Sequence, residues 1–174
     1  MRHILITGRC GVGKSTLIRA LIRAIPAPVC GMITIIEAAG PDGFCPVFIH
    51  TYGEPKRFDD YNRVGLCREG KSIAFPEAFD RFAETMRYPR ECVIVLDELG
   101  FMESEAHTFT ETVMHTLDEA PLVIAAVRDK DTPFLDAVRA HLRADVYRID
   151  EQNRGEVRET LLNDLPLLLP DLFR

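Results

Sequence analysis

The segment that most constrains the fold is Gly8–Ser15, which reads G-R-C-G-V-G-K-S and matches the phosphate-loop pattern G-x-x-x-x-G-K-[ST]. The apolar run Ile4–Ile6 precedes it and a helix-like segment follows, so the chain is predicted to form a strand, a loop and a helix in that order. Glycines let such a loop point its backbone N–H groups at phosphate oxygens, and the start of the helix adds further free N–H groups. This segment therefore predicts binding of a nucleoside triphosphate.

Individual positions of the loop have distinct expected roles. Lys14 is expected to reach the β- and γ-phosphates, and the Ser15 hydroxyl is expected to bind Mg²⁺. The residues expected to contact the nucleotide here are Gly8, Arg9, Cys10, Gly11, Val12, Gly13, Lys14, Ser15 and Thr16. Because Cys10 lies inside the loop, bound nucleotide should shield its thiol from alkylation.

Strand-like and helix-like segments alternate along most of the chain. Strands are predicted at 92–96, 122–127 and 146–149, and helices at 14–25, 76–86, 103–119, from 132 onward, and at 154–162. The alternation predicts an α/β fold, a three-layer sandwich with a mainly parallel sheet and the ligand at the carboxyl ends of the strands. A length of 174 residues fits one domain over residues 1–174.

Three segments lie outside this alternation. The strand-like runs 30–37 and 44–51 flank the turn signal Gly40–Gly43 and predict an appended β-hairpin. Residues 53–71 are polar and predict either a solvated excursion or a loop that contacts nucleotide or a partner. The apolar tail, residues 165–174, is expected to pack on its own domain, with a subunit contact as the alternative.

Composition narrows the possible partners. A formal net charge of −6 argues against nonspecific binding to nucleic acid and against anionic membrane surfaces. No apolar run approaches the roughly 20 residues of a membrane helix, and no signal-peptide pattern is present. Five scattered cysteines without a C-x-x-C pair predict reduced thiols, and a cytoplasmic location is expected.

An acidic pair follows the predicted strand at 92–96. Asp97 is expected to hold Mg²⁺ opposite Ser15, and Glu98 to orient or deprotonate the water that attacks the γ-phosphate. Gly100 completes a D-x-x-G sequence typical of GTPases, and its N–H is expected near the γ-phosphate. The segment Arg128–Asp131 lacks an N-K-x-D guanine reader, so guanine specificity is unsupported.

Three arginines are candidates for a nucleotide contact, with a structural or surface role as the alternative for each. Arg128 follows the next predicted strand, where it would lie at the carboxyl edge of the sheet, and Arg9 lies in the phosphate loop. Arg154 is expected to stack on the base if it contacts the ligand. His107 and His115 are expected to be ordinary residues of a helix surface.

These residues resemble the small stand-alone nucleoside-triphosphatases that include the cancer-related NTPase, a P-loop group related to RecA/AAA-type ATPases. The matching segments run in order from about residue 3 to 162 and comprise Thr7–Thr16, Gly31–Thr34, Arg63–Gly65, Leu96–Glu103, Phe109 and Asn153–Arg154. The resemblance implies slow, Mg²⁺-dependent hydrolysis of several nucleoside triphosphates, including ATP and GTP, with Lys14 and Glu98 as catalytic residues. Met32 departs from the family, which commonly has an aromatic residue there.

Three functions remain open at the level of sequence. The first is an NTPase in which water attacks the γ-phosphorus in line. The second is a nucleotide-dependent adapter that hydrolyses slowly and binds a protein partner through the hairpin, the polar segment or the tail. The third is a small-molecule or nucleotide kinase, which the acidic pair and the lack of an arginine-rich lid disfavour.

Overall fold

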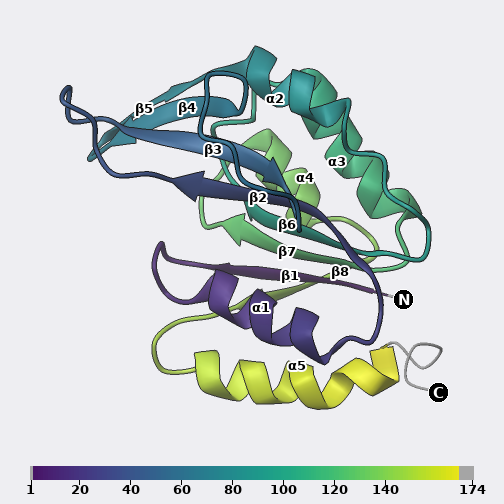
Figure 1. Ribbon diagram of the computed structural model, residues 1–174. Coiled ribbons are helices and arrows are strands. Elements are labelled where there is room, and N and C mark those ends of the chain that lie inside the picture. The colour runs from purple at the N-terminus through teal and green to yellow at the C-terminus, as the bar shows by residue number, and fades with distance from the viewer. Residues whose placement is uncertain (1, 169–174) are drawn as a thin grey trace.

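The structure, a computed structural model, describes residues 2–168, which form one eight-stranded sheet with helices on both faces (Figure 1). The strands lie in the order β5-β4-β3-β2-β6-β7-β1-β8. Those that pair in parallel are β1 (His3–Gly8), β2 (Val29–Ile36), β6 (Val93–Leu99), β7 (Val123–Arg128) and β8 (Ala144–Arg148). Those added in antiparallel pairing are β3 (Cys45–Thr51), β4 (Arg63–Arg68) and β5 (Lys71–Ala74). The predicted α/β class with a mainly parallel sheet is confirmed.

The helices divide between the two faces of the sheet. Below the sheet in Figure 1 are α1 (Lys14–Ala24) and α5 (Arg154–Leu168), and on the opposite face are α2 (Pro76–Ala83), α3 (His107–Glu119) and α4 (Pro133–Arg139). Each face has its own apolar core. Successive residues of β6 alternate between the cores, so Ile94 packs on the α2–α4 side and Val95 on the α1 side. Burial on both faces explains why this strand reads as an unbroken apolar run.

The predicted helices form, and their ends differ by more than one residue in three places. α2 ends at Ala83, before residue 86, and α3 begins at His107, after the predicted start at 103. α5 continues beyond residue 162 to Leu168, and Leu165 is buried in the core beside α1. Residues 169–174 of the predicted tail lie outside the described residues. Between residues 2 and 168, no helix has the length and apolar character needed to cross a membrane.

The predicted β-hairpin forms, but it is part of the main sheet. β2 pairs antiparallel with β3 along one edge and parallel with β6 along the other. The polar segment 53–71, predicted as a solvated excursion or a contacting loop, instead contains β4 and leads into β5, which together extend the sheet. A Cβ at Gly65 of β4 would overlap Met102 Cε, so glycine allows the loop after β6 to pack directly on β4.

Cys30 and Cys92 form a disulfide, which contradicts the prediction of reduced thiols for this pair. The two cysteines are 62 positions apart in sequence. The parallel pairing of β2 with β6 brings their Cα atoms to 5.8 Å. Cys10, Cys45 and Cys67 are free thiols, as predicted.

His3, at the start of β1, is fully buried and ties three segments together. Its Nε2 donates to the carbonyl of Leu117 at 2.6 Å, and its Nδ1 accepts from the Val123 N–H at 3.0 Å. This pattern requires a neutral imidazole with its proton on Nε2. Burial lowers the pKa of His3 from 6.5 to about 4, a change that the bond to Leu117 opposes and that the charges of Arg143 and His141 reinforce.

We expect the free energy of unfolding to fall as the pH drops from 6.5 to about 4, and His3→Gln to flatten this part of the profile. In this window the unfolded chain binds a proton on His3 that the folded chain does not, so acid favours unfolding. The difference between the two pKa values corresponds to roughly 3 kcal/mol in the free energy of unfolding. This contribution is fully present above pH 6.5 and is lost by pH 4. Urea unfolding measured between pH 4 and 7.5 checks this, with the exposed His107→Gln as control. If the free energy of unfolding changed equally with pH in wild type and His3→Gln, the assignment of this effect to His3 would be contradicted.

Candidate functional site

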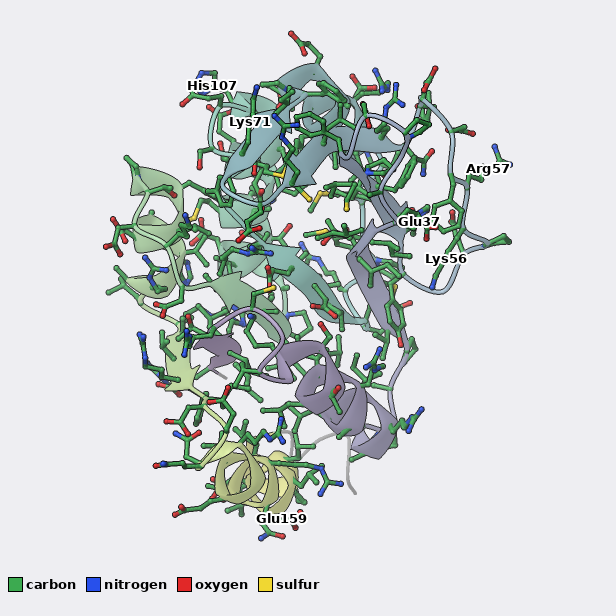
Figure 2. The ribbon with its side chains drawn as sticks, turned by 90° about the vertical axis from the view of Figure 1, so that its left-hand side faces the viewer. Glu37, Lys56, Arg57, Lys71, His107 and Glu159 are labelled. Atoms are coloured by element: carbon green, nitrogen blue, oxygen red, sulfur yellow. A yellow bond between two sulfur atoms is a disulfide. The ribbon has the colours of Figure 1, made fainter. Side chains whose placement is uncertain are left out.

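The predicted phosphate loop joins β1 to α1 at the edge of the sheet where the parallel strands end, and Figure 2 looks onto this edge. Gly13, directly before α1, has φ of 112°, a backbone conformation that other residues rarely adopt. A Cβ at Gly8 would overlap the carbonyl oxygen of Ile149. The path of the loop therefore depends on glycine at both positions, and it directs the first N–H groups of α1 toward the same edge.

Lys14, the first residue of α1, is buried and folds back over the loop. Its Nζ donates to the carbonyl oxygens of Gly8 at 3.0 Å and Arg9 at 3.1 Å. Nζ also lies 3.1 Å from Oε2 of Glu98. These three oxygens match the three hydrogens of the ammonium group, which holds the side chain in one position above the loop.

Ser15 and Asp97 meet across the loop. The Ser15 hydroxyl donates to Oδ1 of Asp97 at 2.9 Å. Burial raises the pKa of Asp97, an effect that the bond from Ser15 opposes and the nearby charge of Glu98 reinforces. Hydroxyl and carboxylate oxygens are ligands of the hard kind that Mg²⁺ prefers. Within residues 2–168 there is no cluster of three or more His, Cys, Asp or Glu side chains that could hold a metal ion.

Glu98 lies between two cations. Its Oε2 faces Lys14, and its Oε1 accepts from Nε of Arg128 at 2.6 Å. The backbone N–H of Glu98 donates to the Thr34 hydroxyl at 3.2 Å, so β2 fixes the strand end that carries the acidic pair. The Glu98 carboxylate therefore lies at a position where an anionic group is held between a lysine and an arginine.

These residues surround a hollow of about 300 Å³, within the range of small-molecule sites. Those of the predicted site residues that line it are Cys10, Gly11, Gly13, Lys14, Ser15, Thr16, Asp97, Glu98 and Arg128. A smaller hollow of about 80 Å³ shares Thr34, Ile36, Glu98 and Arg128 with it and continues toward the α2–α4 side. Residues from the phosphate loop, the start of α1 and the ends of β2, β6 and β7 therefore converge at one place.

The remaining predicted site residues lie around the main hollow. Arg154 approaches the loop from α5, and its Nη1 donates to the carbonyl of Val12 at 3.1 Å. The side chain of Val12 is buried, while Arg9 is exposed and contributes its carbonyl to Lys14. Gly100 lines the smaller hollow, and its N–H donates to the Glu103 carboxylate.

Three residues that the structure places at the site were not predicted from the sequence. Thr34 holds the backbone of Glu98, Ile36 lines both hollows, and Glu103 binds the N–H of Gly100. Thr34 and Glu103 lie in segments that match the family in the sequence, and this match could have pointed to them as site residues. Nothing in the sequence marks Ile36 as a site residue except its place at the end of an apolar strand.

A larger hollow, about 400 Å³, lies away from the phosphate loop. Its lining includes Tyr88, Arg90 and His115, and it contains none of the predicted site residues. His107, in contrast, is exposed at the outer edge of the molecule (Figure 2), as predicted for a surface residue. Size alone therefore does not identify the site, whereas the convergence of complementary charged and hydroxyl groups does.

Comparison with known proteins gives a consistent set of relatives. The chain is 27% identical to the nucleoside-triphosphatase THEP1 of Thermotoga maritima over 93% of this chain and 94% of that protein. It is 26% identical to the human cancer-related nucleoside-triphosphatase over 90% and 92% of the two chains. The crystal structure of THEP1 from Aquifex aeolicus is similar in fold, with a TM-score of 0.66, 22% identity, and coverage of 92% of this chain and 97% of that one.

The family model described as NTPase matches residues 3–162, which span the phosphate loop, the acidic pair and Arg154. The match covers most of the chain and includes every element that forms the site. The fold, with its P-loop topology, agrees with that of the solved relatives. The chain therefore belongs to the NTPase family, a group of enzymes that hydrolyse nucleoside triphosphates.

Proposed function

We propose that this protein hydrolyses nucleoside triphosphates, ATP and GTP among them, to the diphosphate and phosphate in a Mg²⁺-dependent reaction. The observation that carries the proposal is the convergence of Lys14, Ser15, Asp97, Glu98 and Arg128 on one hollow at the phosphate loop. Hydrolysis needs an anion site, metal ligands and a group that acts on water, and this set contains all three.

Ser15 and Asp97 would hold the metal ion, because their oxygens already lie 2.9 Å apart on facing elements. When bound, Mg²⁺ neutralises charge on the phosphate oxygens and fixes their geometry. The loop N–H groups and the start of α1 would bind the β-phosphate from the other side.

Glu98 would orient the attacking water and accept its proton. Binding of the triphosphate would give Lys14 and Arg128 phosphate oxygens as partners in place of the Glu98 carboxylate. The exchange frees Glu98 to act as a base at the moment when the γ-phosphate is in place. Arg128 would then stabilise charge that develops on the γ-phosphate, the role that arginine plays in many phosphoryl transfers.

Arg154 and the remaining loop residues would bind the nucleotide away from the reacting phosphate. The bond from Arg154 to Val12 lets its guanidinium reinforce the loop, and its planar face is suited to stack on the base. Gly8, Gly11, Gly13 and Thr16 would contribute backbone contacts. Gly100 would lie near the γ-phosphate while its N–H stays bonded to Glu103.

A phosphate-release assay across ATP, GTP, CTP and UTP, with and without Mg²⁺, tests the proposal. We expect release from several triphosphates with Mg²⁺ and little release when the metal is chelated. Transfer of labelled γ-phosphate only after addition of a nucleoside or sugar would instead indicate a kinase. No phosphate release, together with a partner captured only in the presence of a non-hydrolysable triphosphate, would indicate an adapter.

A cytoplasmic location belongs to the same proposal, because nucleoside triphosphates are abundant there. Cell fractionation with a specific antibody tests the location directly.

Bound triphosphate should protect Cys10 from alkylation. The residue is exposed and lines the main hollow, so a nucleotide on the loop would cover its thiol. Peptide mass mapping after brief iodoacetamide treatment, with and without Mg²⁺ and a non-hydrolysable triphosphate, checks this. Cys45 serves as the internal control, because it is a free, part-buried thiol that does not line the main hollow. Equal labelling of Cys10 in both samples would contradict the placement of the nucleotide.

A further inference from the structure

Glu103 is a buried acid for which the reaction outlined above has no role. Only 3% of its surface is exposed, and it lies in the turns between β6 and α3. No salt bridge joins it to a lysine, arginine or histidine among residues 2–168. Burial of an acidic group without a cation is costly, so a residue of this kind calls for an explanation.

The carboxylate of Glu103 closes the loop that begins directly after Glu98. It accepts the backbone N–H of Gly100, two residues beyond Glu98 in the chain. The side chains between them hold the loop from outside: Met102 packs against Gly65 of β4, and Lys130 lies over the ring of Phe101 at 5.1 Å from its centroid. The loop is thus fixed on three sides, and Glu103 provides the internal contact.

Glu103 also lies beside the groups proposed to act on the phosphate. The charged and titratable residues that line the smaller hollow with it are Glu98 from β6, Arg128 from β7 and Cys67 from β4, while α2 contributes the apolar Phe79. Burial raises the pKa of Glu103 to about 7, with the charge of Glu98 adding to the rise and Gly100 and Arg128 opposing it. Near neutral pH the charge of Glu103 in this hollow therefore changes with pH.

We propose that Glu103 is a positioning residue for hydrolysis, which fixes Glu98 by closing the loop behind it and tunes triphosphate binding by placing a second carboxyl beside Arg128. The inference rests on the proposed function. The neutral form of Glu103 leaves Arg128 available to the γ-phosphate. The ionised form attracts Arg128 and repels the phosphate, so the affinity for triphosphate falls as the pH rises.

Two substitutions separate the contact from the charge. Glu103→Gln keeps the volume and an oxygen that accepts from Gly100, but it cannot ionise. Glu103→Leu removes both the acceptor and the charge and suits the apolar surroundings. Glu105→Gln removes a charge from an exposed position two residues away and serves as the matched control.

The measurements are kcat and KM for phosphate release from Mg-ATP between pH 5.5 and 8.5, with thermal unfolding of each variant. For wild type and Glu105→Gln, we expect KM to rise about fivefold through pH 7, whereas Glu103→Gln keeps the low-pH KM and a kcat within about twofold of wild type. For Glu103→Leu, we expect kcat to fall about tenfold, because Glu98 loses its fixed position.

The inference would be overturned if the KM of Glu103→Gln depended on pH as it does in wild type. It would also be overturned if Glu103→Leu folded and kept the kcat of wild type. If Glu103→Leu does not fold, the comparison of Glu103→Gln with wild type decides the matter. If wild type itself releases no phosphate, the proposed function fails separately. The pH dependence of the Kd for a fluorescent non-hydrolysable triphosphate, which needs no turnover, then tests Glu103.

Discussion

The Glu98→Gln variant is expected to release phosphate about 10²-fold more slowly than wild type, or slower still, while binding triphosphate about tenfold more tightly. Glutamine keeps the shape of the side chain but cannot accept the proton of the attacking water. It also removes the negative charge that lies 3.1 Å from Nζ of Lys14 and 2.6 Å from Nε of Arg128. Both cations are then free for phosphate oxygens.

Single-turnover phosphate release and equilibrium binding of a fluorescent triphosphate measure the two effects of Glu98→Gln separately. Glu159→Gln, an exposed change on α5, is the control and should match wild type in both assays. Normal hydrolysis by Glu98→Gln would remove Glu98 from the mechanism. Slower hydrolysis with weaker binding would show that Glu98 does not compete with the phosphate for Lys14 and Arg128.

The second large effect is expected for Lys14→Ala, which should weaken triphosphate binding by about 10²-fold or more. The substitution removes the buried ammonium group that bonds to Gly8 and Arg9 and faces Glu98. The loop then lacks the charge that would bridge the phosphates, and Glu98 retains only Arg128 as a partner.

Isothermal titration with Mg²⁺ and a non-hydrolysable triphosphate measures the loss of affinity in Lys14→Ala. Lys56→Ala, at an exposed position beyond β3, controls for the loss of one positive charge. The double variant Lys14→Ala with Glu98→Gln should lose more affinity than the sum of the separate effects predicts, because without Lys14 the loss of the Glu98 charge frees only Arg128. An unchanged Kd in Lys14→Ala would disprove its role in binding.

Local signals made part of this molecule predictable from sequence. The phosphate loop is one, since its glycines and its place between strand and helix are local properties. The start of α4, predicted at residue 132, is another, because the Thr132 hydroxyl accepts the Leu135 N–H at 3.2 Å and Pro133 takes the first helical position. The meeting of Ser15 with Asp97 was also predictable, because parallel strands bring their carboxyl ends to one edge.

Features that depend on distant partners were not predictable in the same way. β4 lies within a polar segment of the sequence, and the reason for glycine at its position 65 is the close approach of Met102 from a loop far along the chain. The disulfide of Cys30 with Cys92 depends on the order of strands in the sheet. In the sequence, Glu103 looks like an ordinary acidic residue at the start of a helix. The structure shows that it is buried and accepts the Gly100 N–H.

The position of β1 in the sheet has a consequence for synthesis of the protein on the ribosome. β1 is the first strand made, yet both of its neighbours, β7 and β8, are among the last, with Ile4 facing Ile124 on one side and Asp145 on the other. The phosphate loop at its end cannot be supported until these late strands have emerged. Such long-range pairing slows folding and leaves apolar strands exposed meanwhile. Nascent chains of this protein should therefore acquire nucleotide only when almost complete.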